Sequence, residues 1–198
     1  MGAKRELIFV IGGARSGKSS YAEELARQLG ERVLYVATAQ AGDAEMEARI
    51  ATHRRARLAS WRTLEAASNV GHAIRDALSI DSADGVLLDC VTLLVSNVLL
   101  GDVSLSEDEY EGVDERAAAQ RVERELDDLV SAYQDGTVSW VVVSNEVGWG
   151  LVPPYPVGRI YRDLLGRANR RLAAEADCVY LMVAGLPVDI KTISGQPR

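Results

Sequence analysis

Residues 12–19, GGARSGKS, have the types and spacing of a loop that binds phosphate groups. The loop follows an apolar run and precedes a helical pattern, which is the context that this P-loop motif requires. Its glycines let backbone N–H groups turn toward phosphate oxygens, and the start of the helix directs its positive dipole end at them. Lys18 is expected to reach the β and γ phosphates, and Ser19 to bind Mg²⁺. The predicted nucleotide contacts in this loop are Gly12, Gly13, Ala14, Arg15, Ser16, Gly17, Lys18 and Ser19.

A P-loop usually works with a carboxylate that follows another strand and helps to hold the metal. Asp89 fits this role, because an apolar run leads directly into it. Glu146 lies two residues past another apolar run, where a role toward a second substrate and a role as a loop cap are equally open. We therefore predict that Ser19 and Asp89 hold Mg²⁺.

His53 is a second candidate centre and one of only two histidines in the chain. The segment around it, RIATHRRARLASWRTLE at 49–65, is rich in arginine although the protein has a formal net charge of −7. An arginine-rich helix face is usually solvated, and a lone histidine is usually structural. Together they indicate a clamp for a triphosphate or a phosphorylated substrate. The arginines of this segment are Arg49, Arg54, Arg55, Arg57 and Arg62.

These arginines also bear on the chemistry of the imidazole. Neighbouring positive charge disfavours the imidazolium and lowers the pKa of His53, so a neutral nitrogen is available near neutral pH. Facing an α-phosphate, that nitrogen is equipped to form a phosphoramidate. A plain small-molecule kinase, in which His53 only bonds to a phosphate, stays open as the alternative. His72 has no such neighbours and is predicted to be structural.

The elements that must position these residues alternate along the chain. Most of the predicted strands are apolar almost throughout, which is typical of strands covered on both faces. We therefore predict an α/β fold of three layers, with helices flanking a mostly parallel sheet, as a single domain over 1–198. The predicted strands are 7–11, 33–37, 85–89, 138–144 and 178–183, and the predicted helices are 18–29, 43–57, 69–80, 114–134 and 158–176.

Composition excludes several classes of protein. With 22 basic against 29 acidic residues, a broad nucleic-acid-binding surface is not expected. No signal peptide and no apolar stretch long enough to insert into a membrane is evident, which predicts a cytoplasmic protein. Cys90 and Cys178 each lie in an apolar run and are predicted to be reduced core residues.

The remaining motifs narrow the kind of nucleotide-binding protein. No N-K-x-D base-reading motif occurs, so a regulatory GTPase is a poor fit, and the acidic composition argues against a motor or RecA-type ATPase. A small-molecule kinase or nucleotidyltransferase remains, with a non-enzymatic nucleotide-binding protein as the rival outside enzymes. The stretch 101–115 is predicted to be an acidic surface loop, and 147–158 a Gly- and Pro-rich loop beside the ligand.

Several further motifs run through nearly the whole chain: YVATAQ at 35–40, LLDCVTLLVSN at 87–97, VVSNEVGWGLVP at 142–153, RIYRDLLGRAN at 159–169 and VAGLPVDIK at 183–191. With the P-loop and the His53 segment, they resemble the adenosylcobinamide kinase/adenosylcobinamide-phosphate guanylyltransferase family of cobalamin biosynthesis. The resemblance implies a bifunctional enzyme. It phosphorylates adenosylcobinamide with ATP or GTP and then transfers GMP from GTP, through a guanylyl-histidine, to give adenosylcobinamide-GDP.

The resemblance also implies a RecA-like P-loop fold, a homotrimer and a corrinoid substrate. By motif, His53 becomes the guanylylated residue, and residues 147–162 are suspected to line the corrinoid pocket. The further nucleotide contacts that the resemblance implies are Ala37, Thr38, Ala39, Arg54, Arg55, Ala56, Arg57, Glu65 and Asp89.

Overall fold

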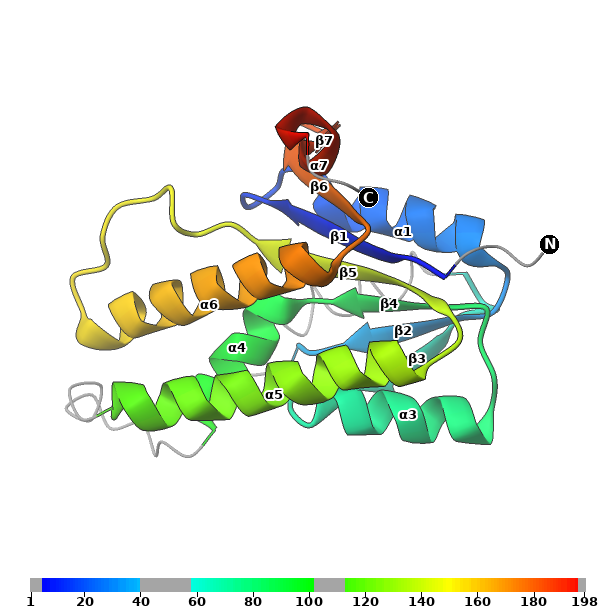
Figure 1. Cartoon of the computed structure of the whole chain (residues 1–198), viewed down its shortest axis with the longest axis horizontal. Helices are drawn as coiled ribbons and strands as arrows, with labels where there is room; N and C mark the ends of the chain where they lie inside the picture. The colour runs from blue at the N-terminus through cyan, green and yellow to red at the C-terminus, as the bar shows by residue number, and fades with distance from the viewer. Residues whose placement is uncertain (1–4, 40–57, 102–112, 196–198) are drawn as a thin grey trace.

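The computed structural model describes residues 5–39, 58–101 and 113–195. Within these residues, seven strands form one sheet in the order β3-β2-β4-β5-β1-β6-β7. Every neighbouring pair is parallel except β6 and β7, which are antiparallel (Figure 1). The strands are β1 (Leu7–Gly12), β2 (Val33–Ala37), β3 (Arg62–Glu65), β4 (Gly85–Asp89), β5 (Ser139–Asn145), β6 (Cys178–Val183) and β7 (Leu186–Asp189).

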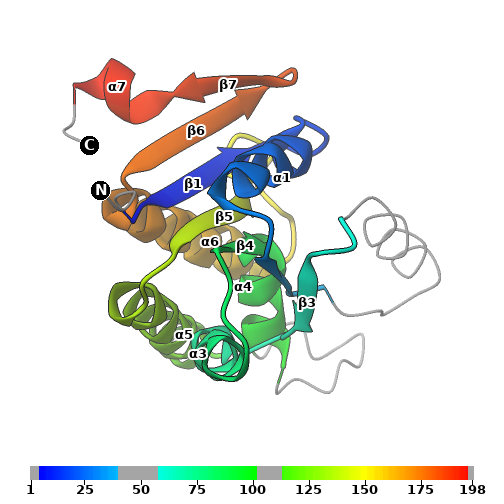
Figure 2. The ribbon, with the colours of Figure 1, turned by 90° about the vertical axis from the view of Figure 1, so that its right-hand side faces the viewer.

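Helices cover both faces of this sheet. Figure 2 shows α1 on one face and α3, α5 and α6 on the other. The predicted mostly parallel α/β architecture is therefore confirmed. Among the described helices, none is long and apolar enough to cross a membrane. The helices are α1 (Lys18–Leu29), α3 (Val70–Ile80), α4 (Val91–Leu100), α5 (Glu115–Asp135), α6 (Pro156–Glu175) and α7 (Ile190–Ser194).

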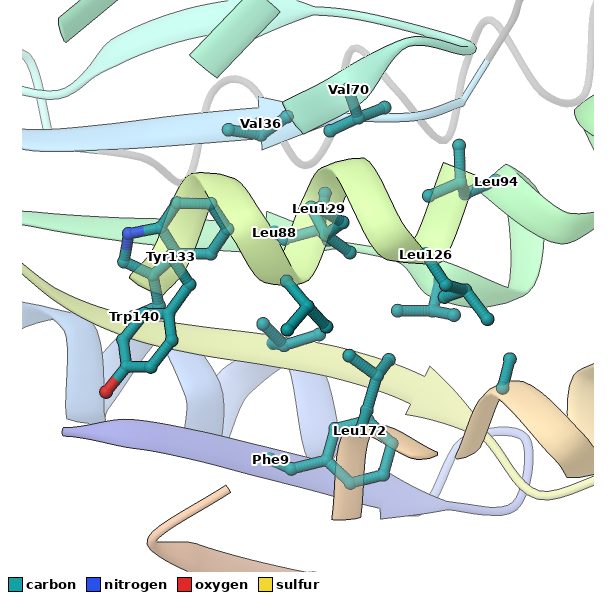
Figure 3. Close-up of a cluster of buried hydrophobic side chains, with 14 of the residues drawn as sticks. Phe9, Val36, Val70, Leu88, Leu94, Leu126, Leu129, Tyr133, Trp140 and Leu172 are labelled. Carbon is teal, nitrogen blue, oxygen red and sulfur yellow. The ribbon is translucent and has the colours of Figure 1, made fainter. Parts of the chain in front are cut away.

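The core lies in two layers because successive strand residues point to opposite faces. In β1, Phe9 joins the cluster beneath α3 to α6, whereas Val10 joins the cluster beneath α1. Figure 3 shows part of the first cluster, in which Tyr133 of α5 lies against Trp140 of β5, with ring centroids 5.8 Å apart, and Leu126 of α5 lies toward Leu94 of α4. Both faces of the central strands are thus buried, which explains why their sequences are apolar almost throughout.

All five predicted strands and four of the five predicted helices are present, with ends within two residues of the prediction. The predicted helix at 43–57 and most of the acidic stretch 101–115 lie outside the described residues. Within the described residues, four elements were not predicted: β3, β7, α4 and α7. The sequence of α4, VTLLVSNVLL, is apolar and rich in β-branched residues, so it carries neither a polar helix face nor high helix propensity.

Candidate active site

The carboxyl ends of β1 to β5 meet at one edge of the sheet. Gly12 at the end of β1 lies opposite Asn145 of β5. Ala37 at the end of β2 lies opposite Asp89 of β4 on one side and Glu65 of β3 on the other. Residues that are far apart in the sequence are thereby brought to one edge, where open α/β sheets bind their ligands.

The P-loop connects β1 to α1 at this edge, in the strand, loop and helix context that the sequence predicts. Gly17 has a φ of 91° and is the N-cap residue of α1, and it supplies no side-chain cap. The N–H groups of the first helical turn are therefore available to an anion. Gly13, Ala14 and Arg15 form the exposed outer part of the loop, with Arg15 at a φ of 57°.

Close packing fixes the inner part of the P-loop. A Cβ atom on Gly12 would lie 2.7 Å from Met182 O and 2.7 Å from Ser16 Oγ, so only glycine fits there without moving the loop. Ser16 Oγ is buried and has no hydrogen-bond partner among the described residues. The loop is thus seated tightly against the end of β6.

Lys18 lies over the P-loop, where its Nζ atom donates to Gly13 O at 3.0 Å. Burial lowers the pKa of Lys18, whereas the negative charge of Asp89 acts in the opposite direction. A phosphate in the loop would offer this ammonium group a charged acceptor in place of a neutral carbonyl.

Asp89 and Ser19 were predicted to hold Mg²⁺, and their surroundings fit that ion. Asp89 is half-buried at the end of β4, and Tyr35 Oη donates to its Oδ2 atom at 2.9 Å. Among the described residues, Tyr35 is the only hydrogen-bond partner of this carboxylate, so the Oδ1 oxygen is left for another contact. Ser19 lies in the first turn of α1, directly after Lys18. Hard oxygen donors of this kind are the ligands that Mg²⁺ prefers.

Thr38 directly follows β2 and was predicted to contact the nucleotide. Its side chain is fully buried, and its hydroxyl already has two partners in the protein. Oγ1 donates to Cys90 O at 2.7 Å and accepts from Cys90 N at 2.9 Å. Thr38 therefore joins the end of β2 to the residue after Asp89, which holds this part of the edge together.

Other predicted contacts lie along the same edge. Ala37 is buried at the end of β2, Ala39 is half-buried two residues later, and Glu65 is exposed at the end of β3. His53, Arg54, Arg55, Ala56 and Arg57 lie outside the described residues.

Glu146 follows β5 beside the P-loop, and its contacts favour the loop cap. Its backbone N–H donates to Gly12 O at 3.0 Å, and its Oε1 atom accepts from Gly148 N at 2.5 Å. The carboxylate therefore shapes the start of the loop that follows β5. This position also keeps that loop adjacent to the phosphate-binding residues.

The sequence analysis did not predict two asparagines whose side chains hydrogen-bond to residues at this edge of the sheet. Asn97 of α4 donates from Nδ2 to Thr38 O at 2.8 Å and to Ala67 O at 3.1 Å. Asn169 of α6 accepts from Ser144 Oγ at 2.6 Å and donates to Asn145 O at 3.0 Å. Each asparagine lies within a largely apolar helix face, and a buried amide in such a place needs partners. An asparagine among apolar helix residues could therefore have been predicted from the sequence to bond to a neighbouring element.

The loop between β5 and α6 carries large apolar side chains in contact with solvent. The most exposed are Leu151 at 96%, Trp149 at 75% and Tyr155 at 70%. Arg159 fastens the loop to the start of α6 by donating to Pro154 O at 2.7 Å. Exposed apolar side chains gathered on one loop are typical of a binding surface.

Both cysteines are core residues as predicted, whereas the structural role predicted for His72 stays a prediction. His72 is exposed on α3, where its Nε2 atom lies 3.2 Å from Asp76 Oδ2. Cys90 and Cys178 form no disulfide and are both buried in the cluster beneath α1. Burial raises the pKa of the Cys90 thiol to about 11, which keeps it protonated.

The fold and the candidate site together define a P-loop protein of the α/β class, with its glycine-rich loop at the carboxyl edge of the sheet. A family model described as cobinamide kinase / cobinamide phosphate guanyltransferase matches residues 8–190. The chain therefore belongs to this family, and it is an enzyme.

Curated relatives agree with that membership over nearly their whole length. The chain is 43% identical over 189 residues to the bifunctional adenosylcobalamin biosynthesis protein CobU of Salmonella typhimurium, covering 93% of this chain and 99% of the relative. It is 42% identical over 188 residues to CobU of Escherichia coli, with the same coverage. The bifunctional adenosylcobalamin biosynthesis protein CobP of Pseudomonas aeruginosa is 39% identical over 193 residues, covering 98% of this chain and 99% of that protein.

Proposed function

We propose that the protein phosphorylates adenosylcobinamide with ATP or GTP and then transfers GMP from GTP to the product through guanylyl-His53. The observation that carries the proposal is that the P-loop, after β1, and Asp89, at the end of β4, lie at the same edge of the sheet. Ala39 lies at the same edge and leads into the segment that contains His53. This connection along the chain supports a site in which His53 reaches the bound nucleotide.

In the kinase step, the oxygen of the substrate hydroxyl bonds to the γ-phosphorus, the bond to the β-phosphate oxygen breaks, the nucleoside diphosphate leaves and the hydroxyl proton passes to solvent. Lys18 and the N–H groups of the P-loop stabilise the charge on the phosphate oxygens. Ser19 and Asp89 would hold Mg²⁺, which supplies further neutralisation of the β and γ phosphates when bound. Asp89 is kept in position by Tyr35 and, through the neighbouring backbone of Cys90, by Thr38.

In the guanylyl transfer, a ring nitrogen of His53 attacks the α-phosphorus of GTP and the bond to pyrophosphate breaks. A phosphate oxygen of adenosylcobinamide phosphate then attacks the same phosphorus, which breaks the N–P bond and restores the neutral ring. In this scheme Arg54, Arg55 and Arg57 take up charge on the transferred group.

The corrinoid is proposed to bind against the loop between β5 and α6. Glu146 connects this loop to the P-loop through the bond from its backbone N–H to Gly12 O. Trp149, Leu151 and Tyr155 are exposed on this loop and would offer apolar surface to the corrinoid. Apolar and aromatic side chains suit a large macrocycle, since such residues line most sites for sizeable ligands.

Two variants test the division of roles. Lys18→Ala should impair both reactions, whereas His53→Ala should abolish guanylyl transfer and retain kinase activity. Loss of a covalent nucleophile commonly costs several orders of magnitude in rate, so product formation separates the outcomes clearly. If His53→Ala still makes adenosylcobinamide-GDP, GMP does not pass through His53 and the histidine intermediate is wrong.

A homotrimer is proposed from the family resemblance alone. Light scattering on the purified protein should give three times the mass of the chain. A mass equal to that of one chain at working concentrations would contradict it.

A further inference from the structure

The turn between β6 and β7 lies against the P-loop, far from it in the sequence. The strands end at the pair Val183 and Leu186, so the turn consists of two residues, Ala184 and Gly185. Their φ angles are 51° and 84°. Positive φ at both positions is the pattern of a tight type I′ hairpin, in which glycine is favoured because other residues are strained there.

Three contacts join this hairpin to the P-loop. The Gly185 N–H donates to Ser16 O at 3.0 Å. A Cβ atom on Gly17 would lie only 3.2 Å from Gly185 Cα, so the two backbones approach closely. At the other end of the loop, the Cβ of any residue replacing Gly12 would meet Met182 O at 2.7 Å.

The position of these contacts suggests what they do. β1 and β6 pair only as far as Gly12 and Met182, so the P-loop beyond that point has left the sheet. Within the loop, the described backbone bonds include a long one from Ser16 N to Gly13 O, at 3.3 Å. The bond from Gly185 supports the far end of the loop, next to Gly17 and the start of α1.

We propose that the β6–β7 turn is a positioning element of the nucleotide site, in which Gly185 holds the Ser16–Gly17 end of the P-loop in its phosphate-binding shape. A loop held in shape before the ligand arrives binds more tightly, because less order must be created on binding. The inference rests on the proposed role of the P-loop as the nucleotide site. It adds a residue outside that motif whose backbone controls the affinity.

A matched pair of glycine variants tests the proposal. Gly185 and Gly195 have φ angles of 84° and 68°, and neither has an atom within 4 Å of an added Cβ, so alanine brings backbone strain without a clash at both. Gly195 is the C-cap residue of α7, and its N–H donates within that helix, to Lys191 O and Thr192 O, whereas the Gly185 N–H donates to Ser16 O of the P-loop. In Gly185→Ala, opening of the turn relieves the backbone strain and breaks the hydrogen bond to Ser16 O. Nucleotide binding must then close the turn again, which costs free energy and weakens binding.

Binding of a non-hydrolysable GTP analogue with Mg²⁺ should therefore weaken up to about tenfold in Gly185→Ala, since the left-handed region costs a non-glycine residue about that much. In Gly195→Ala the dissociation constant should stay at the wild-type value, although both variants lose thermal stability. Equal affinity in Gly185→Ala and wild type overturns the proposal. An equal loss of affinity in Gly185→Ala and Gly195→Ala also overturns the proposal, because the loss would then come from general destabilisation of the protein.

Two further measurements keep the result interpretable. Lys18→Ala should lose most of its affinity for the analogue. If Lys18→Ala binds the analogue like wild type, the P-loop is not the nucleotide site, and the proposed function itself is wrong. If Gly185→Ala does not fold, hydrogen exchange on the wild-type protein decides. The Gly185 amide should exchange more slowly when the analogue is bound, and an unchanged rate contradicts the proposed link to the P-loop.

Discussion

Thr38 provides a direct test of how the edge of the sheet is held, through the change Thr38→Val. Valine has nearly the same shape, so the packing at this fully buried site is kept. What is lost is the hydroxyl that donates to Cys90 O at 2.7 Å and accepts from Cys90 N at 2.9 Å. Each bond contributes about 1 kcal/mol, and leaving the two partner groups buried without water adds a desolvation cost.

The expected loss in the free energy of unfolding is about 3 kcal/mol, which corresponds to about 6–12 °C in the midpoint of thermal unfolding for a chain of this length. Thr38→Ser is the matched control, because it keeps the hydroxyl and loses only a methyl group, at about 1 kcal/mol. Thermal and urea unfolding followed by circular dichroism measure both variants.

The two roles considered for Thr38 give opposite results. If Thr38 bridges β2 to the backbone beside Asp89, Thr38→Val is clearly less stable than Thr38→Ser. A Thr38→Val protein that is as stable as Thr38→Ser but no longer binds nucleotide would refute this reasoning. The hydroxyl would then act on the ligand, as the family resemblance implies.

Three further predictions concern stability, pH and the corrinoid loop. The buried Glu125 accepts from two backbone N–H groups at the start of α3, at 2.8 and 2.7 Å, so Glu125→Gln should lower the free energy of unfolding by about 1–2 kcal/mol in urea titrations. Burial raises the pKa of Cys90 from 9.0 to about 11, so between these pH values the native state keeps a thiol proton that the unfolded state loses. The urea midpoint should therefore fall as the pH rises from 9.0 to about 11. In Cys90→Ala the midpoint should fall less steeply over the same pH range. Trp149→Ala should raise KM for adenosylcobinamide about tenfold and leave nucleotide affinity unchanged, whereas Ile80→Ala, at an equally exposed apolar site on α3, should change neither. Unaltered corrinoid KM in Trp149→Ala would contradict the proposed loop.

The fold was predictable wherever a single periodic pattern decided the element. The central strands β2, β4 and β6 begin and end at the predicted residues, because short apolar runs bounded by polar or glycine residues are distinctive. The edge strands β3 and β7 have four residues each, and their formation depends on the neighbour they pair with. The apolar α4 was missed for a related reason, since its burial on several sides comes from packing against α5 and α6.

At the candidate site, the sequence predicted which residues take part but not the contacts that hold them in place. GGARSGKS predicted the P-loop because glycine and lysine have few other reasons to occur at that spacing. It gave no indication that Gly185 supports the loop, that Tyr35 orients Asp89 or that Thr38 has both hydrogen-bonding groups occupied. Such contacts depend on the register of strands far apart in the chain, which one sequence does not reveal.

The central claim is that His53 takes a guanylyl group from GTP. Intact-protein mass spectrometry after incubation with GTP and Mg²⁺, without corrinoid, tests it directly, and peptide mapping locates the modification. The account predicts a mass increase of one guanylyl group on the peptide that contains His53, acid-labile as a phosphoramidate should be, with release of pyrophosphate. An unmodified His53 in protein that nevertheless converts adenosylcobinamide phosphate to adenosylcobinamide-GDP would contradict it.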